Sequence, residues 1–382
     1  MQPISATKVM LCSLGFSAEG GAQIYTVNSA QALRDSGAVV RVRDSLVRRP
    51  STHAGFHVRP TLPPIRGIRL AASLAGWHNL GDPTEATDLV IAAHVAVLPQ
   101  ALRYAKRNNV PCWLIVYGID IWIRWSASLE AAIRDCDRVI ALSKYTAESV
   151  SSRVNSGRPA VTVIHPTVDT EQFAPLESSE SGEDRPLVIL TVSRLSSAER
   201  YKGHDLIIRA LRRVRKEVGR PIRYQIAGAG DDQARLEALA RDEDVTDLVE
   251  FLGWRSHSDL PDLYRRCDIY AMPSFVSNRG GNDWTGEGFG IVYIEASACG
   301  KPVLACDVGG QVDAVKPGET GLLVKPTVGD VANGLIELLR DGSLRRQMGR
   351  EGRRFVTENF TTDRFRARWG EALTELGSQR HE

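Results

Sequence analysis

An excess of charge of one sign is missing from this 382-residue sequence, in which 48 lysines and arginines face 46 aspartates and glutamates. A dedicated nucleic-acid-binding protein needs clustered positive charge to hold phosphates, so we expect no nucleic-acid partner. Positive charge gathers locally between Arg41 and Arg59, where Asp44 is the one acid beside Arg41, Arg43, Arg48, Arg49 and Arg59. We interpret this stretch as a solvated loop. The alternative is a patch that contacts anionic lipid or an anionic acceptor.

Long apolar runs are missing as well. No run of 18 apolar residues could span a bilayer, and the first ten residues lack the apolar core of a signal peptide. The six cysteines form no Cys-x-x-Cys pair, and we expect them to be buried in a reducing compartment rather than to form disulfides or bind zinc. They are Cys12, Cys112, Cys136, Cys267, Cys299 and Cys306. The protein is predicted to be cytoplasmic, with peripheral attachment to the inner face of the membrane as the alternative.

The order of apolar runs predicts the fold. Short apolar runs alternate with helical stretches from end to end, which is typical of parallel α/β architecture. The strands expected in the first half are 9–14, 39–42, 89–94, 113–117, 139–142 and 161–164, with helices such as 22–34 and 144–153 between them. The sequence turns polar over 171–185, with Ser178, Ser179, Ser181 and Gly182, and predicts a linker there.

The same alternation restarts after the linker. Its expected strands are 187–192, 224–227, 249–252, 269–272 and 303–306. We therefore predict two Rossmann-like domains that face each other across a cleft, with the ligand beyond the carboxyl ends of the strands. The N-terminal domain covers 1–170, the linker 171–185, the C-terminal domain 186–358 and a last helix 359–382. That helix has an apolar face of Phe365, Trp369, Leu373 and Leu376 after a Thr362 N-cap, and could pack back on the N-terminal domain.

A glycine-rich segment carries the strongest chemical signal. It runs from Gly286 to Glu295 and follows a loop with further glycines at 280 and 281. Glycines let a backbone approach a ligand closely, and a helix that begins near Gly290 would direct free N–H groups at a phosphate. Carboxylates would repel a phosphate, so we expect Glu287 and Glu295 to accept hydrogen bonds from sugar hydroxyls. The alternative is a glycine-rich surface loop with solvated glutamates.

Two cations form the second signal. Arg194 follows the expected strand 187–192, and Lys202 precedes a helix, so both side chains should project at the cleft end of the same domain. A guanidinium fork and an ammonium group that converge there fit a diphosphate. Either cation alone would usually be solvated.

These residues resemble those of the retaining, metal-independent glycosyltransferase family 4, which has a GT-B fold. The resemblance rests on Arg194, on Lys202-Gly203, and on Glu287 and Glu295 with seven residues between them. It is supported by segments 226–231, 253–254, 271–274, 308–310 and 318–324, and it is specific over about 187–324. The resemblance implies that Arg194 and Lys202 hold the donor pyrophosphate and that Glu295 holds the nucleotide ribose. It also implies that Glu287 and the backbone of Phe289, Gly290 and Ile291 hold the donor sugar.

The first half offers fewer candidates. Gly20 and Gly21 open a helix and resemble the paired glycines with which the family approaches the donor phosphates, although turns use such pairs constantly. Asp120 and His94 follow expected strands on the cleft side and are candidate catalytic, acceptor or sugar contacts. The family often has a His-Gly pair where this chain has Tyr117-Gly118, which leaves open how the donor sugar is contacted.

Metal ligands and cofactors are not expected. Asp135-Cys136-Asp137 and Asp242-Glu243-Asp244 both precede strands, so we interpret them as loop acids away from the ligand rather than Mg²⁺ ligands. The nucleotide sugar would be a co-substrate, and no metal is expected.

The predicted function is transfer of a hexose from a UDP- or GDP-linked sugar to a saccharide, lipid-linked or small-molecule acceptor in glycan or glycoconjugate biosynthesis. Glu287, Asp120, Arg194 and Lys202 are the expected catalytic residues. Neither Asp120 nor His94 is a convincing general base, and with the resemblance this favours retention at the anomeric carbon. A nucleotide-sugar 2-epimerase is the main alternative. A phosphorylase, a periplasmic sugar sensor and a dehydrogenase fit less well, the last because residues 15–21 lack Gly-x-Gly-x-x-Gly.

Overall fold

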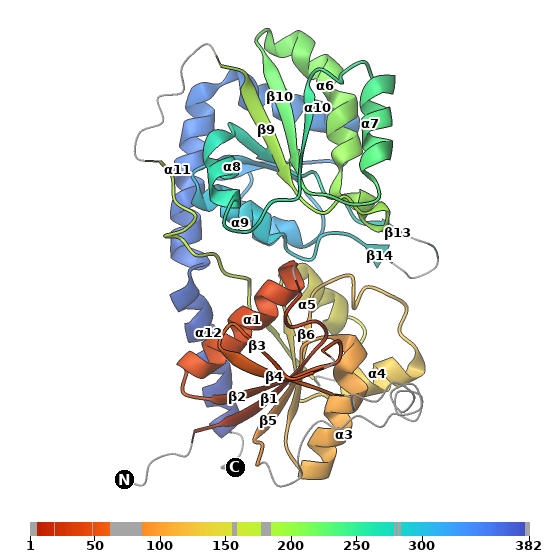
Figure 1. Ribbon diagram of the computed structural model, residues 1–382, viewed down its shortest axis with the longest axis vertical. Helices are drawn as coiled ribbons and strands as arrows, with labels where there is room; N and C mark the ends of the chain where they lie inside the picture. The colour runs from red at the N-terminus through yellow and green to blue at the C-terminus, as the bar shows by residue number, and fades with distance from the viewer. Residues whose placement is uncertain are drawn as a thin grey trace. The chain divides into compact units, whose positions relative to one another are not determined.

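The structure is a computed structural model that describes residues 6–18, 20–47, 49–61, 86–154, 159–176, 185–278, 280 and 284–378 (Figure 1). The chain divides into two compact units, the first comprising Met1–Pro166 with Asp363–Glu382 and the second Thr167–Thr362. Arg48, Gly281 and the polar residues Ser178, Ser179, Ser181 and Gly182 lie outside the described residues.

The first unit is built on a sheet whose order is β3-β4-β2-β1-β5-β6-β7-β8 within the described residues. Its strands are β1 (Lys8–Ser13), β2 (Val39–Asp44), β3 (Ser51–His53), β4 (Phe56–Pro60), β5 (Leu89–Ala92), β6 (Cys112–Val116), β7 (Arg138–Ala141) and β8 (Ala160–Val163). All neighbours are parallel except β3, which runs antiparallel to β4. The central strands β5, β6 and β7 are buried along their whole length, which explains their continuous apolar sequences.

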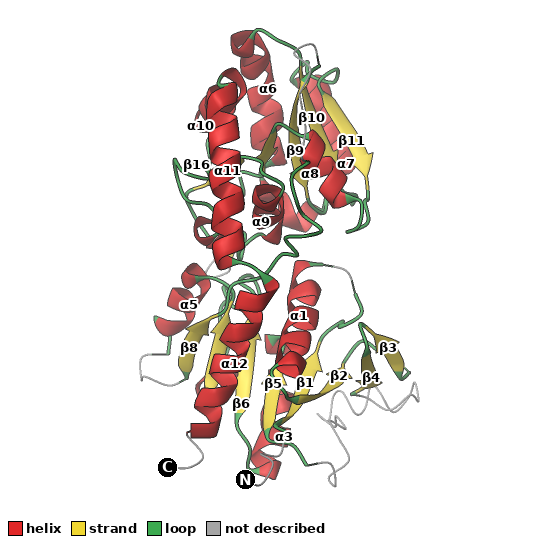
Figure 2. Ribbon diagram, turned by 90° about the vertical axis from the view of Figure 1, so that its left-hand side faces the viewer, coloured by secondary structure: helices red, strands yellow, loops and turns green. Residues whose placement is uncertain are grey.

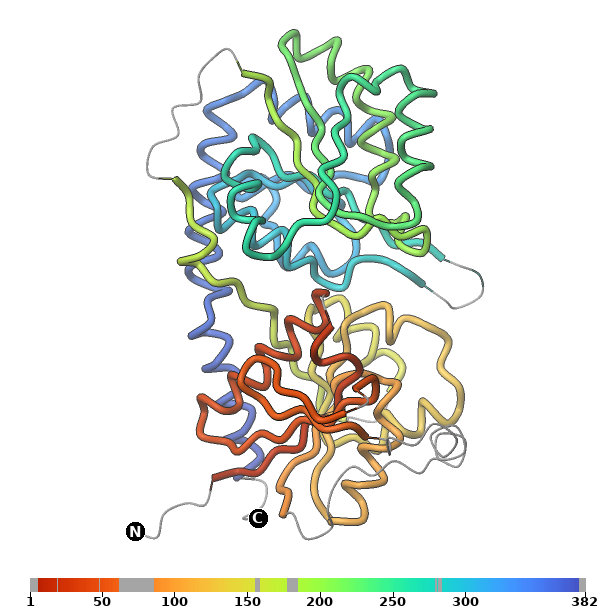
Figure 3. The backbone as a smooth tube through the Cα atoms, viewed as in Figure 1, coloured from red at the N-terminus to blue at the C-terminus, as the bar shows by residue number. Residues whose placement is uncertain are grey.

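Helices cover both faces of this sheet. They are α1 (Gly21–Asp35), α3 (Leu98–Asn108), α4 (Ala127–Arg134), α5 (Lys144–Ser151), the 3₁₀ helix η1 (Val95–Val97) and the C-terminal helix α12 (Thr362–Ser378). One core joins alternate residues of the central strands to α3, α4 and α5. On the other face α12 lies beside α1, with the rings of Tyr25 and Phe365 5.4 Å apart and Arg366 3.0 Å from Asp35 (Figures 2 and 3). Helix α12 thus belongs to the first unit.

The arginine-rich stretch between Arg41 and Arg59 is not the solvated loop that its charge suggested. It forms β2, β3 and β4 at one edge of the sheet, and the side chain of Arg43 is buried. In β4, Phe56 and Val58 point inward while His57 and Arg59 are exposed. This alternation has the two-residue period of a strand, but the charged residues of the stretch favoured the interpretation as a loop.

The second unit has a parallel sheet with the order β11-β10-β9-β12-β15-β16. Its strands are β9 (Leu187–Val192), β10 (Ile222–Ala227), β11 (Val249–Gly253), β12 (Ile269–Ala271), β15 (Val303–Cys306) and β16 (Gly321–Val324). A short antiparallel ribbon of β13 (Ser277–Asn278) and β14 (Trp284–Thr285) interrupts the long loop after β12. The positions of β9 and β15 agree with the expected strands.

The helices of this unit pack on both faces of its sheet (Figure 2). They are α6 (His204–Val218), α7 (Gln233–Asp242), α8 (Leu260–Arg266), α9 (Ile291–Ala298), α10 (Val328–Arg340), α11 (Gly342–Asn359) and the 3₁₀ helices η2 (Ser197–Lys202) and η3 (Gly310–Asp313). Helices α6, α7 and α10 share one apolar core with β9 and β10. The start of the expected linker packs on this unit, because Arg353 donates to the carbonyls of Thr170 and Phe173.

All six cysteines are unpaired and buried, as the sequence predicted. None of the described helices combines the length and apolar character needed to cross a bilayer.

Candidate active site

The candidate site of the second unit lies where β9, β10 and β12 end. These strands are parallel neighbours, so the loops that follow them meet at one edge of the sheet. The loops after β9 and β10 run in contact, since Leu195 N–H donates to Ala229 O at 3.0 Å. Glycine makes this approach possible: a Cβ at Gly228 would lie 1.7 Å from Ser193 O, and the φ of Gly228 is +152°. The fold therefore brings Arg194 to the edge on a tightly held loop.

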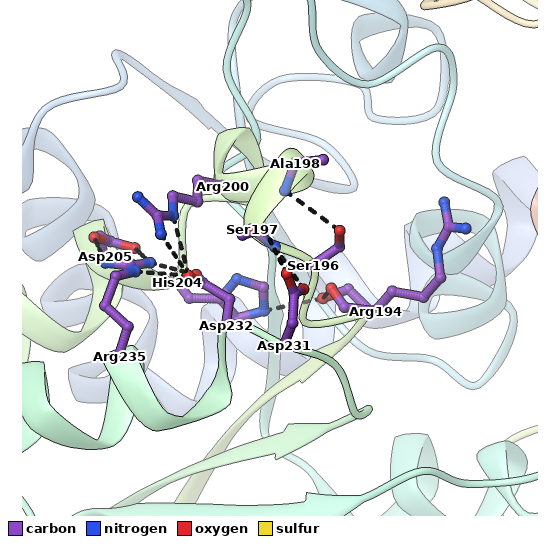
Figure 4. A network of polar contacts seen from close by, with 11 residues as sticks. Arg194, Ser196, Ser197, Ala198, Arg200, His204, Asp205, Asp231, Asp232 and Arg235 are labelled. Carbon is purple, nitrogen blue, oxygen red and sulfur yellow. Dashed lines mark hydrogen bonds and ion pairs between the residues drawn. The ribbon is translucent and has the colours of Figure 1, made fainter.

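A network of carboxylates holds this loop in place (Figure 4). Asp231, just after β10, accepts hydrogen bonds from the backbone N–H and hydroxyl of Ser197 at 2.9 and 2.5 Å. The buried carboxylate of Asp232 accepts from Arg200 at 3.0 Å. Arg235 joins Asp232 to Asp205 at the start of α6. This network could not be predicted, because its charged residues come from segments about 30 residues apart and look like ordinary surface charge in the sequence.

The two predicted phosphate-binding cations differ in their surroundings. The Arg194 side chain is 70% exposed and forms an ion pair with Glu199. The Lys202 side chain is 13% exposed, and its Nζ lies 3.3 Å from the Oε2 of Glu287. Burial, the largest single effect, would lower the pKa of Lys202, but the neighbouring groups Glu287, Tyr201 and Glu199 together outweigh it and the pKa is raised above its ordinary value. Lys202 is therefore a fixed positive charge beside a carboxylate.

Glu287 lies in the loop that leads into α9, as predicted from the glycine-rich motif. Its carbonyl accepts the N–H of Gly310 at 2.8 Å, and Gly290 caps the helix with a φ of +82°. No side chain caps this end of α9 within the described part of the chain. The side chain of Phe289 is buried against Phe360, with ring centroids 5.7 Å apart, so at this position the loop offers backbone rather than side chain. A helix N-terminus of this kind attracts anions.

Glu295 lies on the same helix and is buried. Its Oε2 accepts from the hydroxyl of Tyr264 at 2.8 Å, and its Oε1 lies 3.2 Å from Nε2 of His257. The hydrogen bond to Glu295 raises the pKa of His257, whose ring packs on Phe173 at 5.2 Å. Sequence reasoning missed His257 and Tyr264, because neither belongs to a motif. The role of Glu295 toward a ribose stays a prediction.

The candidates of the first unit form a separate group. Gly20 caps α1 with a φ of +147°, and Gly21 is the first residue of that helix. Asp120 accepts the backbone N–H groups of Tyr117 and Gly118 through Oδ1 at 2.9 and 2.8 Å. Its Oδ2 is buried and has no hydrogen-bond partner among the described residues. Burial raises the pKa of this carboxyl, against the opposing charge of His94 and the backbone N–H groups.

Tyr117 is engaged in packing at the position where the family often has histidine. Its hydroxyl lies 2.6 Å from that of Thr26 and donates to Ala93 O at 3.1 Å. The ring of His94 stacks on it with centroids 6.4 Å apart and an interplanar angle of 27°. The Nδ1 of His94 accepts the N–H of Ala96 at 3.0 Å, so the neutral ring carries its proton on Nε2. His94, Tyr117 and Asp120 thus lie together, and their contact to a sugar stays a prediction.

The acids of the Asp135-Cys136-Asp137 string have structural partners, and in the second string Glu243 pairs with Arg209 at 2.7 Å. Asp135 pairs with Lys106 at 2.7 Å, and Asp137 accepts the N–H of Cys112 at 2.8 Å. No group of three or more metal-ligating side chains was found among the residues that the structure describes.

Comparison with known proteins relates both halves of the chain to one class. Residues 19–172 match the family described as Glycosyltransferase Family 4, and residues 175–355 match the family described as Glycosyl transferases group 1. The GDP-mannose-dependent alpha-(1-6)-phosphatidylinositol monomannoside mannosyltransferase of Mycolicibacterium smegmatis is 34% identical over 306 residues, which are 76% of this chain and 75% of that protein. The D-inositol 3-phosphate glycosyltransferase of Salinispora arenicola is 32% identical over 279 residues, 66% of this chain and 59% of that protein.

Solved structures share the fold. The sucrose-phosphate synthase of Thermosynechococcus elongatus has a TM-score of 0.77 at 21% identity, with 98% of this chain and all of that chain covered (100%). Anabaena HepE in complex with UDP and glucose has a TM-score of 0.73 at 21% identity, with 97% of this chain and 100% of that chain covered.

The fold is that of GT-B glycosyltransferases, which use a nucleotide-sugar donor. The chain belongs to glycosyltransferase family 4. The resemblance seen in the sequence is thereby confirmed. The relatives named above are transferases, and they give the 2-epimerase alternative no support.

Proposed function

We propose that the protein transfers a hexose from a UDP- or GDP-linked sugar to a saccharide, lipid-linked or small-molecule acceptor with retention at the anomeric carbon. The observation that carries the proposal is the Lys202–Glu287 pair beside the N-terminus of α9, with Arg194 on the adjacent loop. Cations and backbone N–H groups suit a diphosphate, and the adjoining carboxylate suits sugar hydroxyls. The diphosphate and the sugar of the donor would therefore both meet complementary groups at one edge of the sheet.

The activities for which the relatives are named support this range of substrates. The mycobacterial relative uses GDP-mannose and acts on a phosphatidylinositol monomannoside, and the other acts on D-inositol 3-phosphate. These names keep a lipid-linked and a small-molecule acceptor open for this chain. The structural neighbour with UDP keeps a uridine donor open beside a guanosine one.

In the proposed reaction, the bond between the anomeric carbon and the diphosphate oxygen breaks, and the acceptor oxygen forms the new bond to that carbon. The acceptor hydroxyl gives its proton to an oxygen of the departing diphosphate. Arg194, Lys202 and the end of α9 stabilise the charge that develops on that leaving group. Glu287 orients the sugar through its hydroxyls. The products are the glycosylated acceptor and the nucleoside diphosphate.

A donor panel tests the proposal. We expect one of UDP-glucose, UDP-galactose or GDP-mannose, and not ADP-glucose, to raise the melting temperature and to release its nucleoside diphosphate slowly in water and faster with acceptor. A nucleoside diphosphate at 100 times its Kd should stabilise by about 2.7 kcal/mol. Glu287→Gln should abolish turnover, while Glu243→Gln, which removes an equal charge from an ion pair with Arg209, should not. A sugar altered on an intact nucleotide would instead identify an epimerase.

Metal independence is part of the proposal. The positive charge of Arg194, Lys202 and the α9 N-terminus can neutralise a departing diphosphate without a divalent cation. We expect release of nucleoside diphosphate to continue at an unchanged rate in EDTA. Loss of that rate in EDTA with recovery in Mn²⁺ or Mg²⁺ would reject metal independence.

A further inference from the structure

The loop between the two cations carries a carboxylate that the proposed function does not use. Glu199 lies in η2, between Arg194 and Lys202 in the sequence, and pairs with the guanidinium of Arg194. Its side chain is only 11% exposed, whereas that of Arg194 is 70% exposed. An acid beside cations that should bind an anion requires a physical reason, because it opposes the binding of any phosphate there.

Each cation at this edge has its own carboxylate. Lys202 pairs with Glu287 and Arg194 with Glu199, so the formal charge of the four side chains sums to zero before a ligand arrives. The negative charge of Glu199 also contributes to the raised pKa of Lys202, so Glu199 interacts electrostatically with both cations. Glu287 is assigned to the sugar. Glu199 is left as a counter-ion only.

The second oxygen of Glu199 makes the arrangement unusual. Oε2 is buried and has no hydrogen-bond partner in the part of the chain that the structure describes. A buried, unsatisfied carboxylate oxygen costs stability, so the carboxylate is not explained by loop folding alone. Among the described residues, Arg194 is the one polar contact of this carboxylate, through Oε1.

The loop is fixed while the arginine can move. Glu199 N–H donates to Ser196 O at 2.8 Å, Ser197 is held by Asp231, and Arg200 is held by Asp232. The Arg194 side chain extends away from this network (Figure 4). A change of Arg194 rotamer would therefore exchange the carboxylate for a phosphate without any movement of the backbone.

We propose that Glu199 is a resident competitor for Arg194, which holds the guanidinium when the site is empty and weakens the binding of the nucleoside diphosphate that leaves. The inference rests on the proposed function. Glu199 thereby limits product inhibition: its repulsion of the nucleoside diphosphate favours release, after which the ion pair with Arg194 forms again. It is a residue that sets affinity and takes no part in bond making or breaking.

The test measures the Kd of UDP, GDP and ADP by calorimetry for the full chain and for Glu199→Gln. We expect the variant to bind the preferred nucleoside diphosphate about three- to tenfold more tightly. The corresponding gain in binding free energy lies between the energy of an exposed ion pair and that of a charge-assisted hydrogen bond. Its inhibition by that nucleoside diphosphate during turnover should strengthen by the same factor. Glu199→Asp, which keeps the charge, should not show the gain. Glu243→Gln controls for net charge and should bind as the wild type does.

The outcomes separate the inference from the proposed function. Equal or weaker binding by Glu199→Gln, with a wild type that binds UDP or GDP, would overturn the inference and indicate that Glu199 positions Arg194. An equal gain in Glu199→Asp or Glu243→Gln would also overturn it. A wild type that binds none of the three nucleotides would reject the proposed function and this inference with it.

Discussion

At the scale of single residues, the two cations should differ in how much they contribute. Lys202 is paired and mostly buried, so its removal leaves Glu287 without a counter-charge, whereas Arg194 is exposed. Charge-assisted hydrogen bonds contribute about 1.5–3 kcal/mol, and each ~1.4 kcal/mol is a factor of ten. We expect Arg194→Ala to lower kcat/KM for the donor about tenfold and Lys202→Ala about a hundredfold.

Steady-state release of nucleoside diphosphate measures both effects. Arg209→Ala is the matched control, because Arg209 is an exposed cation of α6 that pairs with Glu243 outside the site. If a folded Lys202→Ala variant had wild-type kinetics, the assignment of the phosphate site to the region beside α9 would be wrong.

His204 gives the second prediction at the scale of residues. It begins α6, its Nε2 lies 2.9 Å from the hydroxyl of Ser193, and burial, aided by the charge of Lys202, lowers its pKa from 6.5 to about 4. The unfolded chain takes up this proton below pH 6.5, whereas the folded chain does so only near pH 4. His204 therefore does not reduce the free energy of unfolding above pH 6.5. Between pH 6.5 and pH 4 its titration lowers the free energy of unfolding progressively, by about 3 kcal/mol in total.

Urea denaturation at pH 7 and pH 5 checks this expectation. His204→Gln keeps an amide near Ser193 without a titrating proton, so its free energy of unfolding should fall less between the two pH values than that of the wild type. An equal fall in both proteins would mean that His204 is already accessible to protons in the folded state.

At the scale of elements, the close approach of the loops after β9 and β10 should be the least tolerant feature of the site. Gly228→Ala places a Cβ 1.7 Å from Ser193 O and should destabilise by at least about 3 kcal/mol, with loss of nucleotide binding. Gly253 also has a positive φ, of +70°, but an open surrounding, so Gly253→Ala should cost only about 1 kcal/mol. Urea denaturation compares them. Equal losses would show that backbone strain rather than loop contact decides the effect.

Element positions were predictable where the pattern was long and apolar. Strands 187–192 and 303–306 are buried between helices, and their apolar runs set them apart. The start of α9 followed from the glycines around Glu287. Strands β3 and β4 were not predicted, because both are short and neither contains a continuous apolar run. The residues that contact Glu295 could not be predicted, because a contact such as His257–Glu295 joins residues 38 positions apart in the sequence.

At the scale of the whole molecule, the second unit carries the motifs expected for binding the donor, whereas residues for the acceptor are expected in the first unit. The groups proposed to bind the phosphates and the carboxylates Glu287 and Glu295 lie in short segments whose chemistry any diphosphate and sugar would require, so residues such as Lys202 and Glu287 could be proposed from the sequence. The acceptor makes no such uniform demand. In the first unit the candidates are His94 and Asp120 at strand ends, and their neighbour Tyr117 departs from the family's usual histidine. This half therefore identifies the family without naming the acceptor.

Stereochemistry is the remaining prediction at this scale. An inverting enzyme needs a general base across the ring from the leaving group, to take the proton of the acceptor as it attacks. Glu287 is paired with Lys202 at 3.3 Å and is suited to hold sugar hydroxyls. One oxygen of Asp120 already accepts two backbone N–H groups, and burial raises the pKa of this carboxyl, so Asp120 is not arranged as an exposed carboxylate that could take the acceptor proton. The departing diphosphate is itself a base on the face that it leaves.

We therefore expect an α-linked donor to give an α-linked product. Proton NMR of the anomeric region during turnover distinguishes the two outcomes, because α and β anomers differ in their coupling constants. Asp120→Asn provides the matched variant: if the diphosphate takes the proton, this variant should keep the α configuration and a measurable rate. A β-linked product, with activity lost in Asp120→Asn, would assign the base to Asp120 and reject retention.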